Sequence, residues 1–238
     1  MCIRDRAAPI ILLANTAGGT GKSISAHAMA VASAEYGKKV LLIDADPAST
    51  LTFLTGIENP RITVAELLSK SASPDIAIMK SAERFSLIPN ASRANGIEGS
   101  WSWVSHAAEG FDLVIIDSAS GPSITLKNLL DIANLVIIPV LNSFLSIRGA
   151  LHIRDFLSAR SQSPAMSLLP TQCAGLNSEI TQLVGEDFSI LEPAIRFGEE
   201  VRESESSMRS VLTASPHCGS ASDYREVTYS ILESLSLL

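Results

Sequence analysis

The chain has 238 residues, a formal net charge of −7, and a composition that is 46% hydrophobic and 18% charged. These values indicate a well-cored globular chain, and the negative charge argues against a broadly basic nucleic-acid binder. Three scattered cysteines suggest neither a disulfide framework nor a metal site, which fits a reducing compartment. The longest apolar runs are too short to cross a bilayer and no apolar signal segment is visible, so we expect a cytoplasmic protein.

Short apolar runs alternate with longer amphipathic segments, which is typical of a parallel sheet with crossover helices. The predicted strands are residues 10–14, 40–43, 85–88, 113–116, 135–140, 166–169 and 189–191. The predicted helices are residues 23–36, 64–70, 99–108, 124–133, 146–160, 179–184 and 223–237, and 199–210 is expected to be a surface helix or loop. We therefore predict an α/β fold, a doubly wound and mostly parallel sheet flanked by helices on both faces.

One domain is expected over residues 7–238, because no linker or internal repeat divides the chain. Residues 1–6 resemble a translated adapter sequence, and we expect them to be a non-native or disordered leader. Of the two tryptophans that flank Ser102, one is expected in the core and the other partly exposed.

A glycine-rich segment between the first strand and the first helix carries the strongest functional signal. From Ala17 to Ser23 it reads A-G-G-T-G-K-S. Backbone N–H groups in such a loop, together with the following helix N-terminus, bind phosphate, and the glycines permit a close approach. Lys22 is expected to reach the terminal phosphates and the Ser23 hydroxyl to bind Mg²⁺.

Acidic residues follow two of the predicted strands. Asp44 and Asp46 come after the second strand, and Asp117 comes after strand 113–116. Ligands of doubly wound sheets bind beyond the carboxyl ends of the strands, where aspartates can hold Mg²⁺ through water or position an attacking water. A helix cap or turn is the alternative for each aspartate alone, but together with the loop they favour a nucleotide site. A dinucleotide site is disfavoured, because Ile24 stands where the third glycine would be.

These motifs resemble the ParA/MinD group of P-loop ATPases, whose deviant Walker A loop reads K-G-G-x-G-K-[ST]. The family's D-x-D-P motif appears at residues 44–47 and its Walker B strand at 115–117. Residues 135–140, which include a proline, and residues 195–203 are similar to later family segments, but weakly. The likeness runs from about residue 10 to the C-terminus, and it implies a P-loop NTPase fold with ATP and Mg²⁺ as cofactors.

The resemblance also implies roles for individual residues. Lys22 and Asp46 would be catalytic, with Asp46 orienting the attacking water. Ser23 would coordinate Mg²⁺ directly, while Asp44 and Asp117 would hold it through water. The nucleotide-binding residues would be Gly18, Gly19, Thr20, Gly21, Lys22, Ser23, Ile24, Thr171 and Gln172, with the last two near the base.

Two positions depart from the family pattern. Ala17 replaces the family's first lysine, which reaches across a dimer to the partner's nucleotide. Such a cross-subunit cation is worth roughly 10³–10⁵ in rate where it acts like an arginine finger. Unless another cation replaces it, we expect ATP binding with slow or altered hydrolysis, or weak dimerisation. Ala48 stands where many ParA proteins carry glutamine, so the switch loop is expected to respond differently.

As for partners, the resemblance implies an ATP-dependent homodimer and a partner protein that stimulates hydrolysis. Non-specific DNA binding is a further option, although acidic neighbours dilute the basic residues and a solvated charged face is the default. Its candidate residues are Arg148, His152, Arg154, Arg160, Arg196, Arg202 and Arg209. The C-terminal apolar stripe is accompanied by Glu226 and Glu233, so we predict packing against the domain and no membrane binding.

The sequence favours a Mg·ATP-binding partition protein for plasmids or chromosomes. The alternative is a nucleotide-gated scaffold that positions conjugation or polar machinery without substantial ATP turnover. A metabolic P-loop ligase, in the manner of dethiobiotin synthetase, ranks lower because no second-substrate motif is apparent. Whether the chain is an active ATPase depends on Ala17.

Overall fold

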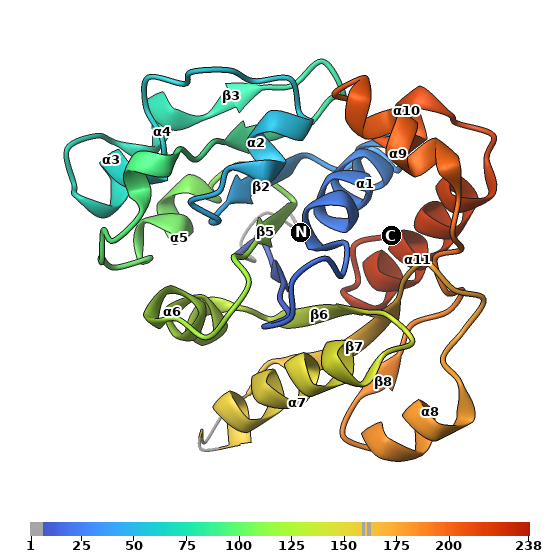
Figure 1. Cartoon of the computed structure of the whole chain (residues 1–238). Coiled ribbons are helices and arrows are strands. Elements are labelled where there is room, and N and C mark those ends of the chain that lie inside the picture. The colour runs from blue at the N-terminus through green and yellow to red at the C-terminus, as the bar shows by residue number, and fades with distance from the viewer. Residues whose placement is uncertain (1–6, 159, 161–162) are drawn as a thin grey trace.

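One sheet organises the computed structural model, which describes residues 7–158, 160 and 163–238 (Figure 1). Within the described residues its strands follow the order β3-β4-β2-β5-β1-β6-β7-β8. Neighbouring strands pair in parallel except β3, which is antiparallel to β4. The strands are β1 (Ile10–Leu13), β2 (Val40–Asp44), β3 (Met79–Lys80), β4 (Ser86–Ile88), β5 (Leu113–Asp117), β6 (Leu135–Val140), β7 (Ala165–Pro170) and β8 (Ser189–Ile190).

Helices cover both faces of this sheet, which confirms the predicted doubly wound fold (Figure 1). The helices are α1 (Lys22–Glu35), α2 (Thr50–Leu54), α3 (Val64–Leu68), α4 (Pro74–Ala77), α5 (Trp103–Ala107), α6 (Ile124–Ile132), α7 (Phe144–Ser158), α8 (Ser178–Val184), α9 (Glu199–Ser206), α10 (Val211–Ala214) and α11 (Gly219–Ser234). A single 3₁₀ turn, Ser92–Ala94, follows β4 in the described part of the chain.

Two hydrophobic clusters fill the spaces between the sheet and its helices. One joins the sheet to α3, α5, α6, α7 and α8, and the other joins it to α1, α2, α10 and α11. Every residue of β2, β5 and β6 is buried, as continuous apolar strands between two helical layers should be. The sheet is therefore a rigid base for the loops at its carboxyl edge.

The C-terminal helix and the tryptophans behave as the sequence predicts. Val227, Ile231 and Leu232 of α11 are buried in the cluster that includes α1, so the apolar stripe packs against the domain. Trp101 is 3% exposed and Trp103 is half-buried. No helix in residues 7–158 or 163–238 is both long and apolar enough to cross a membrane.

Element boundaries depart from the predictions at several places. Helix α7 ends at Ser158, so Arg160 lies outside the helix to which the sequence assigned it. Helix α5 begins only at Trp103, because the preceding Trp101 is buried in the core and holds residues 99–102 in an irregular path. The short elements α2, α4, β3 and α10 were not predicted, since two to five residues are too few to show a periodic pattern. Residues 1–6, the expected leader, lie outside the described residues.

Candidate functional site

The glycine-rich loop leads from the end of β1 into α1, as predicted. Gly19 and Gly21 have φ values of 69° and 89°, a left-handed conformation that glycine adopts without strain. Gly21 is the N-cap of α1 and its carbonyl accepts from Ser25 N at 2.8 Å. The loop therefore presents the N-terminal end of a 14-residue helix at the carboxyl edge of the sheet, where an anion is favoured.

Asn15 fastens the start of this loop to the neighbouring elements, and the sequence analysis gave it no role. It is completely buried, and its Nδ2 donates to Pro139 O at 2.9 Å and to Ser146 O at 3.2 Å. Its Oδ1 accepts from Ala17 N at 2.8 Å. The two bonds from Nδ2 reach residues more than 120 positions away in the sequence, so no local sequence pattern reveals them.

Helix α7 passes very close to the same loop at Gly149. A Cβ atom added at Gly149 would overlap Asn15 Oδ1 and would lie 2.7 Å from Ala17 N. Thr16 Oγ1 donates to Gly149 O at 3.3 Å and lies 3.2 Å from His152 Nδ1. Only glycine fits at this crossing. A glycine inside an amphipathic helix is the one sequence signal that could have indicated this close contact.

Lys22 already turns toward the inside of the loop. Its Nζ donates to Ser120 Oγ at 2.8 Å and to Ala17 O at 3.2 Å, and the residue is 7% exposed. Burial lowers the pKa of Lys22, and the negative charges of Asp117 and Asp46 oppose that shift. The side chain is placed where it could neutralise a phosphate held by the loop.

Asp117 stands out for its lack of partners. It is fully buried, and neither carboxylate oxygen has a hydrogen-bond partner among the described residues. Burial, followed by the charge of Asp44, raises the pKa of Asp117 well above its usual range, while the nearby Ser23 hydroxyl and the charge of Lys22 lower it. A buried carboxylate without partners is costly, which makes it a natural neighbour for a cation.

Asp44 lies beside Asp117 in the β2–β5 register but is fully engaged. Its Oδ2 accepts from Thr52 N at 2.9 Å and Thr52 Oγ1 at 2.7 Å, and its Oδ1 accepts from Asp46 N at 3.0 Å. Burial raises the pKa of Asp44 to about 6, although the bonds from Thr52 lower it. Asp44 thus holds the loop that carries Asp46, in addition to any role near a metal.

Asp46 lies half-buried at the mouth of the site, where its Oδ1 accepts from Ala48 N at 2.8 Å. Asp44 lies opposite Asp117 across β2 and β5, Asp46 N donates to Asp44, and the Ser23 hydroxyl lies near Asp117, so the structure brings these four residues together. No group of three or more His, Cys, Asp or Glu side chains that could hold a metal occurs in the described part of the chain. A Mg²⁺ ion would fit here, because it usually keeps several waters and takes only one or two protein ligands besides substrate phosphates.

A small cavity of about 160 Å³ adjoins the loop on the other side. Thr171 and Gln172 line it, next to Gly21 and Ile24, so the structure brings the predicted base-binding residues together. Thr171 Oγ1 donates to Thr20 O at 3.0 Å, which ties the end of β7 to the loop. The lining residues that the sequence analysis did not assign to the site are Ile195, Arg196, Phe197, Gly198, Val201, Arg202, Glu205 and Tyr224.

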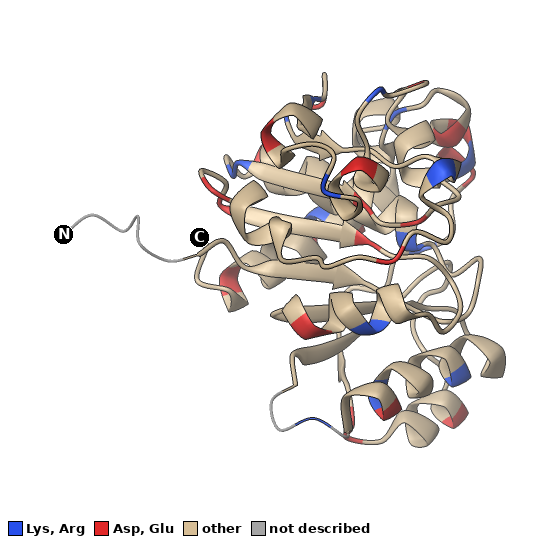
Figure 2. Cartoon of the chain, turned by 90° about the vertical axis from the view of Figure 1, so that its left-hand side faces the viewer, with Lys and Arg blue, Asp and Glu red and all other residues tan. Residues whose placement is uncertain are grey.

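The basic residues named as DNA candidates do not form one continuous stripe. Arg154 pairs with Asp155 and Asp187, and Arg160 pairs with Asp131. The Arg196 guanidinium is bonded to the buried Asp223. Figure 2 shows basic and acidic residues interspersed over the face it presents. His152 is half-buried beside Thr16. Among the described residues, Arg148, Arg202 and Arg209 are exposed and lack an ion pair, so these three are the exposed candidates that remain.

Comparison with known proteins places this geometry in context. A family model described as an AAA domain matches residues 8–166. An uncharacterized ATP-binding protein of Methanocaldococcus jannaschii is 32% identical over 152 residues, which are 61% of this chain and 58% of that protein. The chromosome-partitioning ATPase Soj of Thermus thermophilus is 32% identical over 145 residues, which are 58% of this chain and 57% of Soj. The chain therefore matches less than two thirds of the length of these relatives.

The whole fold is also found among solved structures. The septum site-determining protein MinD of Pyrococcus horikoshii, complexed with Mg-ADP, has a TM-score of 0.79 at 18% identity. The match covers 97% of this chain and 98% of that one. At this level of identity the likeness shows the fold alone.

Proposed function

Because the chain belongs to the AAA-domain family of that model, and within it to the ParA/MinD type of P-loop ATPase, we propose that it is a Mg·ATP-binding partition protein acting on plasmids or chromosomes. The observation that carries the proposal is the pair of unpartnered Asp117 oxygens at the end of β5, beside the loop that bears Lys22 and Ser23. A hydrated cation at this place would compensate the buried carboxylate.

The residues divide into three groups around the nucleotide. The loop residues Gly18 to Ser23 would hold the phosphates, and Lys22 would neutralise the terminal ones. Ser23, with Asp44 and Asp117 behind water, would hold Mg²⁺, which supplies charge neutralisation of the phosphates. The cavity beside Ile24, Thr171 and Gln172, with a volume of about 160 Å³, would take the base.

The hydrolysis step of the proposal depends on Asp46 and Ala17. Asp46 would orient the attacking water, since it lies at the mouth of the site on a loop that Asp44 holds. Ala17 offers no charge for a partner's nucleotide, which favours slow turnover. Slow turnover would also suit a nucleotide-gated scaffold without substantial turnover, which is therefore the second candidate function. In either case we propose a cytoplasmic, ATP-dependent homodimer with a partner protein and, for the partition role, non-specific DNA binding.

The first experiment is calorimetric titration of the chain with Mg·ATP. We expect saturable binding that Lys22→Ala weakens about ten- to a hundredfold, because a charge-assisted hydrogen bond is lost. Lys80→Ala, which removes an exposed lysine of β3, is the matched control and should bind like the unmodified chain. Failure of the unmodified chain to bind Mg·ATP would contradict the proposal.

Turnover and DNA binding separate the two candidate functions. Ala17→Lys should raise ATP turnover or ATP-dependent dimerisation, and if it changes neither, the missing lysine is not what limits hydrolysis. A DNA complex that weakens steeply with salt supports the partition role, because phosphate contacts release counterions. Its absence in the presence of ATP supports the scaffold.

A further inference from the structure

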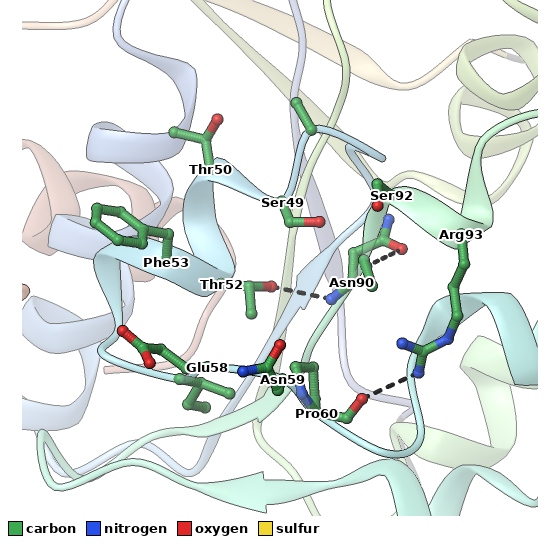
Figure 3. A pocket seen from close by; sticks show the side chains of 13 residues that line it. Ser49, Thr50, Thr52, Phe53, Glu58, Asn59, Pro60, Asn90, Ser92 and Arg93 are labelled. Carbon is green, nitrogen blue, oxygen red and sulfur yellow. Dashed lines mark hydrogen bonds between the residues drawn. The ribbon is translucent and has the colours of Figure 1, made fainter.

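A second and larger pocket opens away from the glycine-rich loop, between α2 and the segment that follows β4 (Figure 3). Its volume is about 710 Å³, within the range of small-molecule sites. The walls consist of residues 48–50, 52–53 and 57–60 on one side and residues 90–93 on the other. Two of these residues contact the proposed nucleotide site from behind, since Ala48 N donates to Asp46 and Thr52 donates to Asp44, but none of them lines the glycine-rich loop.

Most polar groups that line this pocket are neutral hydroxyl and amide groups. Asn90 is 1% exposed, and its Nδ2 has no hydrogen-bond partner among the described residues. Its Oδ1 accepts from Ala91 N at 2.8 Å, so the amide orientation is fixed and the NH₂ group is the free end. A buried donor left without an acceptor is destabilising, and a ligand oxygen would satisfy it.

Two opposite charges flank this donor. Figure 3 shows Glu58 and Arg93 on opposite sides of the pocket, with Thr52 and Asn90 between them. Arg93 Nε donates to Glu66 at 2.9 Å and Nη2 donates to the carbonyls of Pro60 and Arg61, while Nη1 has no partner in the described residues. Glu58 is exposed and has no ion pair there either. The pocket thus offers donors at one end and an acid at the other.

Phe53 and Ile57 add an apolar surface to the wall formed by α2 and the segment after it. The Phe53 side chain is 51% exposed, so an apolar part of a ligand could pack against its ring. A ligand that satisfies the whole pocket needs an anionic or acceptor group, a cationic group and an apolar part.

We propose that this pocket binds a small zwitterion of the amino-acid class. Its carboxylate would accept from Asn90 Nδ2 and Arg93 Nη1, its ammonium group would face Glu58, and its side chain would cover Phe53. Thr52 forms the floor, accepting from Asn90 N at 2.9 Å and donating to Asp44 Oδ2 at 2.7 Å. The site therefore shares one hydrogen-bonded residue with the end of β2 while leaving the glycine-rich loop free.

The test is a thermal-shift and calorimetric screen of the full chain, without nucleotide, against each of the twenty L-amino acids. We expect at least one to bind with a Kd below about 1 mM. For that amino acid, the N-acetyl derivative and the carboxamide should each bind about tenfold more weakly or worse, because each loses a charge-assisted contact. No saturable binding by any amino acid, or equal binding of both blocked derivatives, would overturn the proposal.

Substitutions of the lining residues test whether the selected amino acid binds in this pocket. Asn90→Leu and Glu58→Gln should each lower the affinity for the selected amino acid about tenfold. Because Glu58 is exposed, its replacement should not affect folding, and it keeps the test valid if Asn90→Leu does not fold. Glu226→Gln, on the exposed side of α11, is the matched control and should bind normally. Unchanged affinity in Glu58→Gln places the ligand elsewhere and overturns the assignment. Because the screen uses no nucleotide, its failure leaves the Mg·ATP titration untouched, and the reverse also holds.

Discussion

The two sides of the glycine-rich loop differ in how completely their polar groups are satisfied. On the side of α7, Asn15 uses both ends of its amide, and Thr16 and Thr171 also donate to backbone carbonyls. On the side of β5, Asp117 keeps two buried oxygens without a partner among the described residues. The first side positions the loop, and the second is left for a ligand. A dense bonded frame makes it possible to keep one costly group unsatisfied at the working face.

Breaking the bonded side should have the largest effect. Gly149→Ala places a methyl group against Asn15 and Ala17 N, so α7 or the loop must shift. We expect a loss of about 1–3 kcal/mol in unfolding free energy, typical of overpacking, together with weaker Mg·ATP binding. Urea unfolding and calorimetry measure the two effects. Ser158→Ala, at the exposed end of the same helix, is the control; if both variants unfold alike, the close crossing is not restrictive.

Replacing the unpartnered carboxylate of Asp117 should raise the free energy of unfolding, which is the opposite of the effect expected for Gly149→Ala. Asp117→Asn removes a buried carboxylate that lacks partners, so the nucleotide-free protein should unfold at a higher urea concentration, by roughly 1 kcal/mol. The same variant should lose most of the Mg²⁺ dependence of ATP binding. Asp44→Asn provides the contrast, because it breaks bonds from Thr52 and should destabilise the chain. Equal destabilisation by both variants would remove the distinction between the two aspartates.

The pH dependence sharpens the same contrast. Asp117 and Asp44 have folded-state pKa values above the ordinary 3.8, with Asp44 at about 6, so the folded state binds their protons more tightly than the unfolded state. Their contribution to stability is present below pH 3.8 and is lost as the pH rises through the folded-state pKa. The stability advantage of Asp117→Asn should therefore be small near pH 4 and grow toward pH 7. An advantage that does not change with pH would show that Asp117 is not titrating in this range.

The smallest effect is expected at Thr171. Thr171→Val removes the hydroxyl that donates to Thr20 O at 3.0 Å, and we expect about 0.5–1.5 kcal/mol of lost stability and a modest loss of ATP affinity. Thr171→Ser keeps the hydroxyl and should restore most of the affinity, as measured by calorimetry. If serine and valine behave alike, the methyl group rather than the hydrogen bond is what matters.

The sequence was sufficient to predict features that depend on short-range order. Continuous apolar strands ending in Asp44 and Asp117 predict a shared edge, and the β2–β5 register places the two residues directly opposite each other. Likewise, the glycines before α1 predict the loop by their spacing alone. The contacts of Asn15 with β6 and α7 join residues more than 120 positions apart, so they could not be predicted from one chain. The same holds for Asn90, whose unpartnered amide depends on a pocket built from two distant segments.

The close crossing at Gly149 also bears on how residue 17 can change. A side chain at position 149 would lie 3.1 Å from the Ala17 Cβ, so the two positions compete for one space, which glycine leaves open. A lysine introduced at 17 can use that space only while 149 remains glycine. Substitutions at the two sites should therefore be strongly non-additive, because a side chain at 149 removes the space that a longer residue at 17 would need.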